Sequence, residues 1–182
     1  MEITNYIKIF DNCLDYKTLS KILKYINTLK FVPAELIHGK VTKEIRTTLK
    51  YDLNSINESL SDVHWHNYLV SFFNNSFLKY SEEIKDASIR SIEPLQILKY
   101  EKNCFYQQHV DHASEIPRTV SFIFILNNDY EGGELVFKLQ GKDFVIENKP
   151  NRLVIWPSTF LFPHEVRPVK KGIRYSIVTW AL

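Results

Sequence analysis

The chain has few of the features that mark membrane-spanning, disulfide-rich or zinc-knuckle proteins. Its 182 residues contain no run of 18 apolar residues, so the sequence predicts no membrane-spanning helix. The two cysteines, Cys13 and Cys104, form no C-x-x-C pair, which argues against a zinc knuckle or a dithiol redox motif. Two reduced thiols and an N-terminus without a continuous apolar stretch favour a cytoplasmic protein.

An excess of charge of one sign is also missing, and glycine is scarce. The 23 basic and 21 acidic residues leave a formal charge of +2, so the sequence carries no strong signal for binding nucleic acid or a membrane surface. The five glycines form no Walker or dinucleotide-binding motif. We interpret Gly132-Gly133 as a turn that needs a backbone without Cβ, and Lys170-Lys171 as a solvated turn.

Apolar residues recur at helical spacing in the N-terminal half of the chain. The spacing predicts an amphipathic helix over residues 15–30, with Asp15 as its N-cap, and a second helix over about 62–85. Both helices are expected to pack on the outside of one sheet. The polar, interrupted segment from Pro33 to Leu53 contains a candidate turn at residues 38–40, and we interpret it as a flexible edge beside the site.

The pattern changes from Pro94 onward to short strands separated by polar turns. These strands are rich in Ile, Val, Phe and Tyr, which predicts a sandwich or a barrel against which the two helices pack. The fold class is therefore predicted as α+β and predominantly β. We expect one domain over residues 1–182, in which residues 1–93 form a helical support and residues 94–182 form the core barrel.

The strongest chemical signal is an H-x-D motif, His109 and Asp111, followed 53 positions later by His164 in P-H-E-V. Side chains two positions apart on a strand point to one side, so an extended segment 105–111 would direct His109 and Asp111 into one cavity. The segment 160–166 would then bring His164 from a neighbouring strand. Two imidazoles and one carboxylate can occupy one face of an octahedral Fe(II) and leave the opposite positions open.

A possible anion clamp follows ten positions after His164. The segment 172–180 is predicted to be a buried strand in which Arg174, Ser176, Val178 and Trp180 share a face. Arginine is the side chain best shaped to bind a carboxylate through two parallel hydrogen bonds. A metal triad followed by such an arginine suggests a site for a metal ion together with an organic acid.

The chain resembles the Fe(II)/2-oxoglutarate-dependent dioxygenases of the prolyl 4-hydroxylase type, over roughly residues 94 to 182. Besides the triad and the arginine, the matching motifs are L-Q-I-L-K-Y, Y-x-x-H-x-D, R-T-V-S-F-I-F-I-L-N-N-D-Y-E-G-G-E-L and H-E-V-x-P-V-x-x-G-x-R-x-S. This resemblance implies a double-stranded β-helix, a jelly-roll-like barrel with the metal in its mouth.

The resemblance also implies roles for individual residues. His109, Asp111 and His164 would bind Fe(II), and Arg174 and Tyr100 would bind the distal carboxylate of the co-substrate 2-oxoglutarate. Oxygen is the second co-substrate, and ascorbate is a further candidate cofactor. Residues expected near the substrate are Tyr106, Arg118 and Trp180.

At one position the chain departs from the family pattern. A second tyrosine that reaches the co-substrate in the oxygen-sensing animal members corresponds here to Ile125. The Ser176 hydroxyl is a candidate replacement.

The implied reaction is hydroxylation of a substrate C–H bond with release of succinate and CO2, and a prolyl residue of a protein or peptide is the leading substrate. The first alternative is oxidative demethylation of a nucleic-acid base, which near-neutral charge disfavours. Two others are a catalytically silent barrel that binds a ligand, and a zinc hydrolase, in which Arg174 and Tyr100 would have no role. The sequence indicates no oligomeric state.

The other histidines are expected to lie outside the site. His64 and His66 are two positions apart on the second helix, so they point in different directions and could not easily chelate one metal. His112 is expected to point out of the barrel, and His38 has no partner visible in the sequence.

Overall fold

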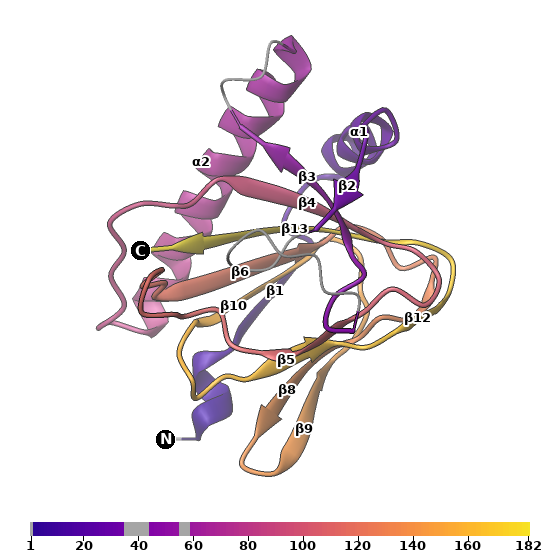
Figure 1. Ribbon diagram of the computed structural model, residues 1–182. Helices are drawn as coiled ribbons and strands as arrows, with labels where there is room; N and C mark the ends of the chain where they lie inside the picture. The colour runs from indigo at the N-terminus through magenta and orange to yellow at the C-terminus, as the bar shows by residue number, and fades with distance from the viewer. Residues whose placement is uncertain (1, 35–43, 55–58) are drawn as a thin grey trace.

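Two antiparallel sheets face each other in the computed structural model, which describes residues 2–34, 44–54 and 59–182 (Figure 1). The larger sheet has seven strands in the order β1-β10-β6-β13-β4-β3-β2. In chain order these strands are β1 (Lys8–Asp11), β2 (Val32–Pro33), β3 (Leu49–Leu53), β4 (Leu95–Tyr100), β6 (Val120–Ile125), β10 (Arg152–Pro157) and β13 (Arg174–Ala181).

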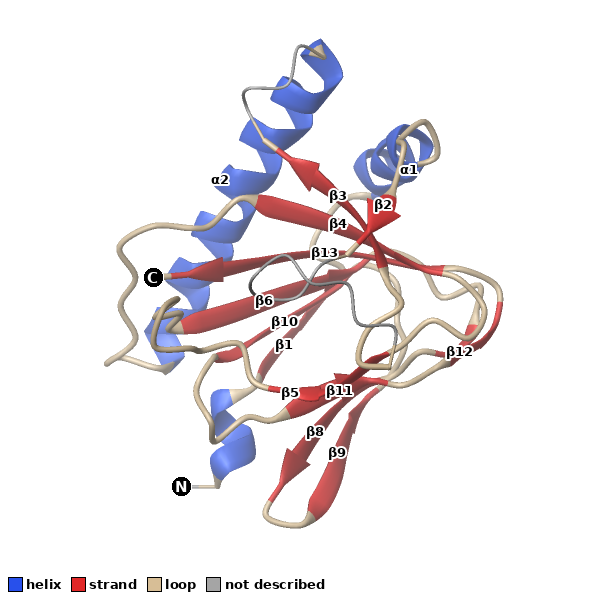
Figure 2. Ribbon diagram, in the orientation of Figure 1, coloured by secondary structure: helices blue, strands red, loops and turns tan. Residues whose placement is uncertain are grey.

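The smaller sheet has four strands in the order β5-β11-β8-β9, and a two-stranded ribbon pairs β12 with β7. These strands are β5 (Tyr106–His109), β7 (Glu131–Gly132), β8 (Leu135–Leu139), β9 (Lys142–Ile146), β11 (His164–Val166) and β12 (Val169–Lys171). In Figure 2 the smaller sheet lies opposite the larger one, as the predicted double-stranded β-helix requires. The predicted fold class is therefore confirmed.

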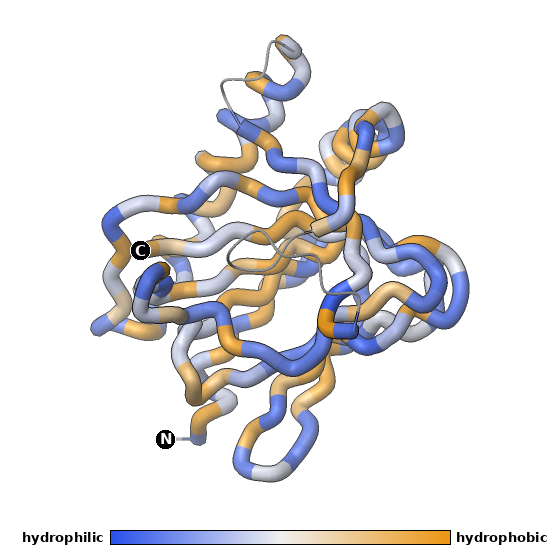
Figure 3. Tube along the Cα trace, in the orientation of Figure 1, coloured by the Kyte–Doolittle hydropathy of each residue, from blue (hydrophilic) through white to orange (hydrophobic). Residues whose placement is uncertain are grey.

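The alternation of side chains along the central strands produces two apolar layers. On β6, Phe122 and Phe124 point to the helices, whereas Ile123 and Ile125 point between the sheets. The inner layer also contains Phe137 of β8 and other residues of the smaller sheet. Figure 3 shows apolar residues along the strands of the large sheet and hydrophilic residues at the β8–β9 turn. Both faces of the large sheet are therefore covered, which explains its nearly continuous apolar strands.

Both predicted helices form and cover the outer face of the large sheet (Figure 1). Helix α1 (Tyr16–Ile26) begins after Asp15, whose side chain accepts a hydrogen bond from the backbone N–H of Thr18 at 2.9 Å, as predicted for an N-cap. Helix α2 (Leu60–Glu83) begins after Ser59 and contacts β6 through aromatic pairs such as Phe73–Phe122. A short 3-10 helix, η1 (Ile3–Tyr6), precedes β1.

Several predicted boundaries were wrong. Helix α1 ends at Ile26, four residues before the predicted end, and α2 begins at Leu60 instead of about residue 62. The polar segment contains the last residue of β2 and the whole of β3, which both belong to the large sheet, and β3 pairs with β4 over its whole length. The candidate turn at residues 38–40 lies outside the described residues. No helix in the described part of the chain is long and apolar enough to cross a membrane.

Candidate metal centre

His109, Asp111 and His164 converge at one end of the space between the sheets. His109 is the last residue of β5 and His164 the first of β11, and the two are directly paired across these antiparallel strands. Nε2 of each histidine lies 3.5 Å from an Asp111 carboxylate oxygen. One ligand atom from each residue lies within 4.8 Å of the other two. This spacing allows all three groups to contact a single ion.

Asp111 reaches the cavity from a different position than predicted. The sequence predicted an extended segment through residue 111, but β5 ends at His109 and Asp111 lies in the turn that follows. Its carboxylate is buried and accepts a 2.7 Å hydrogen bond from Ser121 Oγ on β6. This bond to the large sheet directs the carboxylate into the cavity although Asp111 itself does not lie in a strand.

Backbone carbonyls orient both imidazoles. His109 Nδ1 lies 2.8 Å from the Gln107 carbonyl oxygen, and His164 Nδ1 lies 3.0 Å from the Phe162 carbonyl oxygen. A carbonyl only accepts, so in each ring Nδ1 carries the proton and Nε2 presents its lone pair to the site. This arrangement is typical of histidines that bind metal ions.

The ionisation states also suit a metal ion. Burial lowers the pKa of His164 to about 4, despite the opposing effect of Asp111, so the ring is neutral at pH 7. Burial alone would raise the pKa of Asp111, but His164, His109 and the Ser121 hydroxyl together hold it well below its usual range. Two imidazoles and one carboxylate match the donor set of non-haem Fe(II) sites.

Arg174 lies in the same barrel and has no carboxylate partner. It is fully buried on β13, where it pairs with Tyr100 of β4. Its Nη1 donates to Ser176 Oγ at 3.0 Å, whereas Nε and Nη2 have no hydrogen-bond partner. No carboxylate in the described part of the chain lies within ion-pair distance of this guanidinium. A buried, uncompensated cation is costly, so the site is suited to an anionic ligand.

The sequence did not identify Tyr130, which lies beside Arg174. Gly133, with φ +66°, separates the two: a Cβ on it would lie 3.1 Å from Arg174 Cδ and 3.4 Å from Tyr130 Cε2. The Tyr130 hydroxyl is buried without a hydrogen-bond partner. Burial raises the pKa of Tyr130 despite the nearby guanidinium. An aromatic residue in a polar turn gives no sequence signal for this placement.

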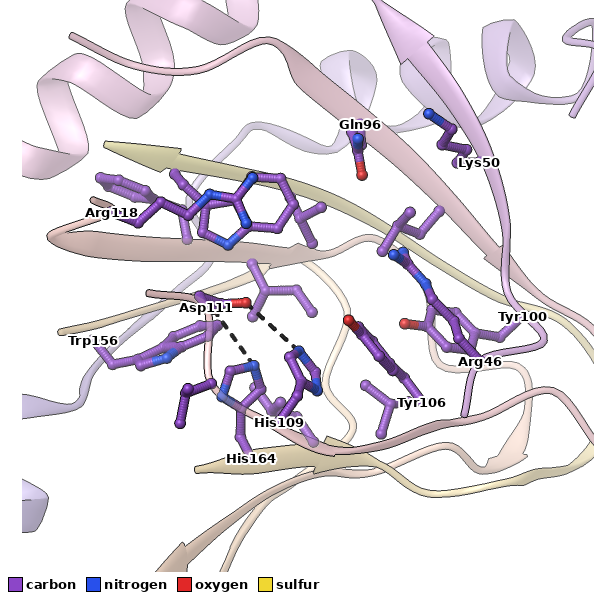
Figure 4. Close-up of a pocket in the computed structure, with 18 of the residues that line it drawn as sticks. Arg46, Lys50, Gln96, Tyr100, Tyr106, His109, Asp111, Arg118, Trp156 and His164 are labelled. Atoms are coloured by element: carbon purple, nitrogen blue, oxygen red, sulfur yellow. Dashed lines mark ion pairs between the residues drawn. The ribbon is translucent and has the colours of Figure 1, made fainter. Parts of the chain in front are cut away.

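A cavity of about 250 Å³ opens beside the triad (Figure 4). Three residues predicted near the substrate, Tyr106, Arg118 and Trp180, line it together with Tyr100. The Tyr106 ring stacks on the His109 ring with centroids 3.6 Å apart. Arg174 and Ser176 are not among the lining residues and lie more deeply buried.

Arg118 is paired within the protein, which the sequence did not predict. Its Nε and Nη2 each donate a 2.7 Å hydrogen bond to Glu93, and its guanidinium lies 3.7 Å from the centre of the Trp180 ring. Glu93 lies just before β4, 25 positions from Arg118, and its sequence context gives no indication of this contact.

Several further residues around the triad were missed. Ser121 contacts Asp111, and Ser158 Oγ lies 2.7 Å from Ser121 Oγ. Trp156 packs against the His164 ring at 5.0 Å, and its Nε1 is buried without a partner. A detectable signal existed for Ser121, because it is the single polar residue in the strand V-S-F-I-F-I.

The remaining histidines lie away from the triad in the described structure. His112 is exposed, and its Nδ1 lies 2.9 Å from the Arg118 carbonyl oxygen. His64 and His66 lie on α2, on the outer side of the large sheet. Within residues 2–34, 44–54 and 59–182, the triad is the one group of three or more His, Cys, Asp or Glu residues placed to hold a metal. His38 lies outside these ranges.

Comparison with known proteins points to one family. The model of the 2OG-Fe(II) oxygenase superfamily matches residues 95–182. A PKHD-type hydroxylase of Gloeothece citriformis is 30% identical over 153 residues, which cover 81% of this chain and 67% of that protein. A PKHD-type hydroxylase of Crocosphaera subtropica is 36% identical over 98 residues, which cover 50% of this chain and 43% of that protein. The chain thus matches less than half the length of this second relative.

Solved structures share the fold. A prolyl hydroxylase of Trichoplax adhaerens, in complex with a hypoxia inducible factor oxygen degradation domain peptide fragment, superimposes with a TM-score of 0.82 at 21% identity. The match covers 98% of this chain and 84% of that one. A Pseudomonas putida prolyl-4-hydroxylase gives a TM-score of 0.76 at 19% identity, and the match covers 97% of this chain and 92% of that one. At these identities the likeness establishes the architecture.

Proposed function

The chain belongs to the 2OG-Fe(II) oxygenase superfamily, and we propose that it hydroxylates a prolyl residue of a protein or peptide. One observation carries the proposal. Two imidazoles and a carboxylate face one cavity, while a buried arginine without a carboxylate partner among the described residues lies in the same barrel. A metal-only hydrolase would have no use for that arginine.

The metal and the co-substrate have distinct binding groups in this proposal. His109, Asp111 and His164 hold Fe(II), as the separation of their ligand atoms and their ionisation states support. Arg174 holds the distal carboxylate of 2-oxoglutarate, with Tyr100 and Ser176 beside it. When bound, iron, 2-oxoglutarate and O2 supply the oxidising chemistry, and succinate and CO2 are released.

The protein's own residues orient the ligands and exclude water. The Gln107 and Phe162 carbonyls hold the imidazole rings with Nε2 toward the site, and Ser121 holds the carboxylate. Arg174 would need little rearrangement to bind an anion, because its Nη1 is already held by Ser176. Preorganised donors of this kind bind charge at small reorganisation cost.

The cavity walls support a compact, apolar substrate group such as a prolyl ring. Trp180 and Tyr106 present aromatic surfaces, and Leu98, Ile123 and Val178 add aliphatic ones. The peptide-bound Trichoplax prolyl hydroxylase and the PKHD-type hydroxylases support the same substrate class. Arg118 would contact the substrate from the rim through the guanidinium edge that Glu93 leaves free.

We also propose a location and a domain organisation. Both cysteines are free, which suits a reducing compartment such as the cytoplasm. Residues 94–182 would form the catalytic barrel, in keeping with the family match at residues 95–182. Residues 1–93 would be its support, which supplies the two helices and also adds β1, β2 and β3 at the edges of the large sheet.

The proposal is tested by incubating the protein with Fe(II), 2-oxoglutarate, ascorbate and a panel of prolyl peptides. We expect succinate to form together with a peptide that has gained one oxygen atom, as measured by mass spectrometry. Omitting ascorbate tests whether it is required. His109→Ala should abolish both products, whereas the matched variant His112→Ala, at an exposed position, should retain them. Turnover with a methylated nucleic acid alone would contradict the proposal.

A further inference from the structure

Arg46 lines the cavity beside the triad but has no carboxylate partner among the described residues. It is only 7% exposed, and its Nε is buried without a hydrogen-bond partner. Figure 4 shows Arg46 next to Tyr106, on the side of the cavity opposite Arg118. This buried cation lies near the mouth, apart from the deeper Arg174.

The other two cations of the cavity wall are already paired. Arg118 donates two 2.7 Å hydrogen bonds to Glu93, and Lys50 Nζ lies 2.7 Å from Asp52. Among the described lining residues there is a single carboxylate, Asp111, which faces the two imidazoles and Ser121. Within that set, Arg46 is therefore a positive charge without a carboxylate partner.

The backbone around Arg46 holds its guanidinium in place. Arg46 forms an antiparallel bridge with Tyr106. On either side of it, the Gln107 N–H donates to the Ile45 carbonyl at 2.9 Å, and the Thr47 N–H donates to the Phe105 carbonyl at 3.2 Å. This segment therefore extends the β5 edge, and the arginine is anchored to the strand that carries His109.

Stacking places the guanidinium at a defined separation from the metal centre. Arg46 Cζ lies 4.5 Å from the centre of the Tyr106 ring, and that ring lies 3.6 Å from the His109 ring. An extended peptide advances roughly 3.3 Å per residue. A peptide whose reacting residue lies at the metal would therefore pass Arg46 within about three residues.

A purely structural role does not account for this arrangement. A guanidinium stacked on tyrosine gains a modest cation–π attraction, and an exposed arginine could make the same contact. Here the side chain is also mostly buried and its Nε is closed off from water, and burial of a charge is costly unless an opposite charge accompanies it. A carboxylate from a ligand would remove this cost and complete the hydrogen bonding of the planar guanidinium.

We propose that Arg46 binds the carboxylate of an Asp or Glu side chain in the peptide substrate, within about three residues of the oxidised prolyl. This inference rests on the proposed function and narrows its substrate class to acidic peptides. The preference is confined to one position, because a fixed guanidinium meets one side chain of an extended peptide.

The test uses a set of otherwise neutral prolyl peptides. Each peptide carries one Asp at a different position, from three residues before to three residues after the proline, and each has a matched peptide with Asn at that position. Fluorescence anisotropy measures binding of each labelled peptide to the protein with Fe(II) and 2-oxoglutarate under anaerobic conditions. Turnover assays with O2 then give kcat/KM for each peptide. We expect one Asp peptide to exceed its Asn twin by about 10-fold or more.

Variants identify the residue responsible for this preference. Arg46→Gln should reduce the Asp-to-Asn ratio to about 1, and Arg46→Glu should favour a Lys peptide at the same position. Lys50→Gln also removes one positive charge from the cavity wall, but Lys50 is already paired with Asp52. This variant should therefore keep the Asp-to-Asn ratio of the wild type. If Arg46→Gln folds poorly by circular dichroism, Arg46→Lys provides the comparison, because a point charge should retain only part of the preference.

Three results would overturn the inference. The wild-type protein could bind Asp and Asn peptides alike at every position, Arg46→Gln could keep the preference, or it could raise the KM for 2-oxoglutarate without changing the ratio. Failure of the proposed function would look different. Anisotropy would still report an Asp preference that depends on Arg46, while no peptide gained oxygen.

Discussion

The Ser121 hydroxyl donates a 2.7 Å hydrogen bond to Oδ2 of Asp111 inside the barrel, and its own oxygen lies 2.7 Å from Ser158 Oγ. Ser121 has one proton and gives it to the carboxylate, so the Ser158 hydroxyl must donate to Ser121. The direction of the chain of hydrogen bonds is thereby determined. It holds Oδ2 from the β6 side and keeps the carboxylate directed at the imidazoles.

Ser121→Ala should weaken Fe(II) binding by about 10- to 100-fold, the usual effect of removing a hydrogen bond to a metal ligand. The reason is that Asp111 would lose its neutral donor and the orientation that the donor imposes. Isothermal titration calorimetry with Fe(II) under anaerobic conditions measures the change. Ser76→Ala removes another buried hydroxyl, bonded to the Phe72 carbonyl in α2, and should leave metal affinity unchanged. Equal affinities of wild type and Ser121→Ala would contradict this role.

Arg174→Met should abolish stabilisation of the Fe(II)-loaded protein by 2-oxoglutarate. Wild type should gain about 2.7 kcal/mol of unfolding free energy at a ligand concentration 100-fold above Kd, which differential scanning fluorimetry detects as a rise in Tm. Without co-substrate, the variant should be at least as stable as wild type, because an uncompensated buried charge has been replaced by an apolar side chain.

Arg174→Lys is the matched comparison for that charge. Lysine keeps the charge but lacks the planar fork, so the rise in Tm should be reduced but not lost. A full rise in Tm for Arg174→Met would show that 2-oxoglutarate binds elsewhere.

Gly133→Ala should destabilise the protein more than Gly141→Ala. Both glycines have positive φ, +66° and +78°, so each alanine costs about 1–2 kcal/mol of backbone strain. A Cβ at Gly133 would also lie 2.9 Å from the buried Val169 Cγ2 and 3.1 Å from Arg174 Cδ, whereas Gly141 has nothing within 4 Å. Urea denaturation should therefore give a further loss of about 1–3 kcal/mol at Gly133.

The same pair of variants also separates strain from function. Gly133→Ala should reduce the 2-oxoglutarate-dependent rise in Tm by displacing Arg174, and Gly141→Ala should preserve it. Equal losses of unfolding free energy in the two variants would show that the steric contact has no effect.

Asp11→Asn should lower stability at pH 7 by about 1–1.5 kcal/mol, because water screens this exposed carboxylate but the two-pronged contact with the buried Arg152 retains part of the attraction. Asp11 accepts hydrogen bonds from Arg152 Nε at 2.7 Å and Nη2 at 3.1 Å, and from Lys149 Nζ at 2.8 Å. These cations, Arg152 foremost, hold the pKa of Asp11 well below its usual range. A lowered folded-state pKa stabilises the protein above the unfolded-state pKa of about 3.9, and this contribution is lost as pH falls below it.

Urea denaturation at a series of pH values measures this dependence. The difference between wild type and Asp11→Asn should be constant above about pH 5 and shrink as the solution becomes more acidic. Asp52→Asn, at an exposed carboxylate that pairs with Lys50, should cost less than about 1 kcal/mol. A difference between wild type and Asp11→Asn that does not change with pH would rule out the ion pair as its source.

Much of the fold was predictable because its signals are local. The helical spacing of Leu19, Ile22 and Ile26 indicated the buried face of α1, and Asp15 marked its start. The strand β3 was missed although Leu49–Leu53 alternates apolar and polar residues, because the segment is short, the residues around it are polar, and its pairing with β4 joins segments more than 40 positions apart. Strand pairing depends on the partner as well as on the strand's own residues.

The sequence alone determined the identity of the reactive groups. The H-x-D motif, the second histidine and the arginine of β13 could be read directly, since metal ligands and anion clamps require particular residue types. Only the tertiary structure decided which polar residues support them and which remain unpaired. Ser121 contacts Asp111, and Glu93 pairs with Arg118, while Arg46 is buried with no carboxylate partner in the described part of the chain. These relationships follow from the closure of two sheets over one cavity, because burial and pairing depend on groups brought together from distant parts of the chain.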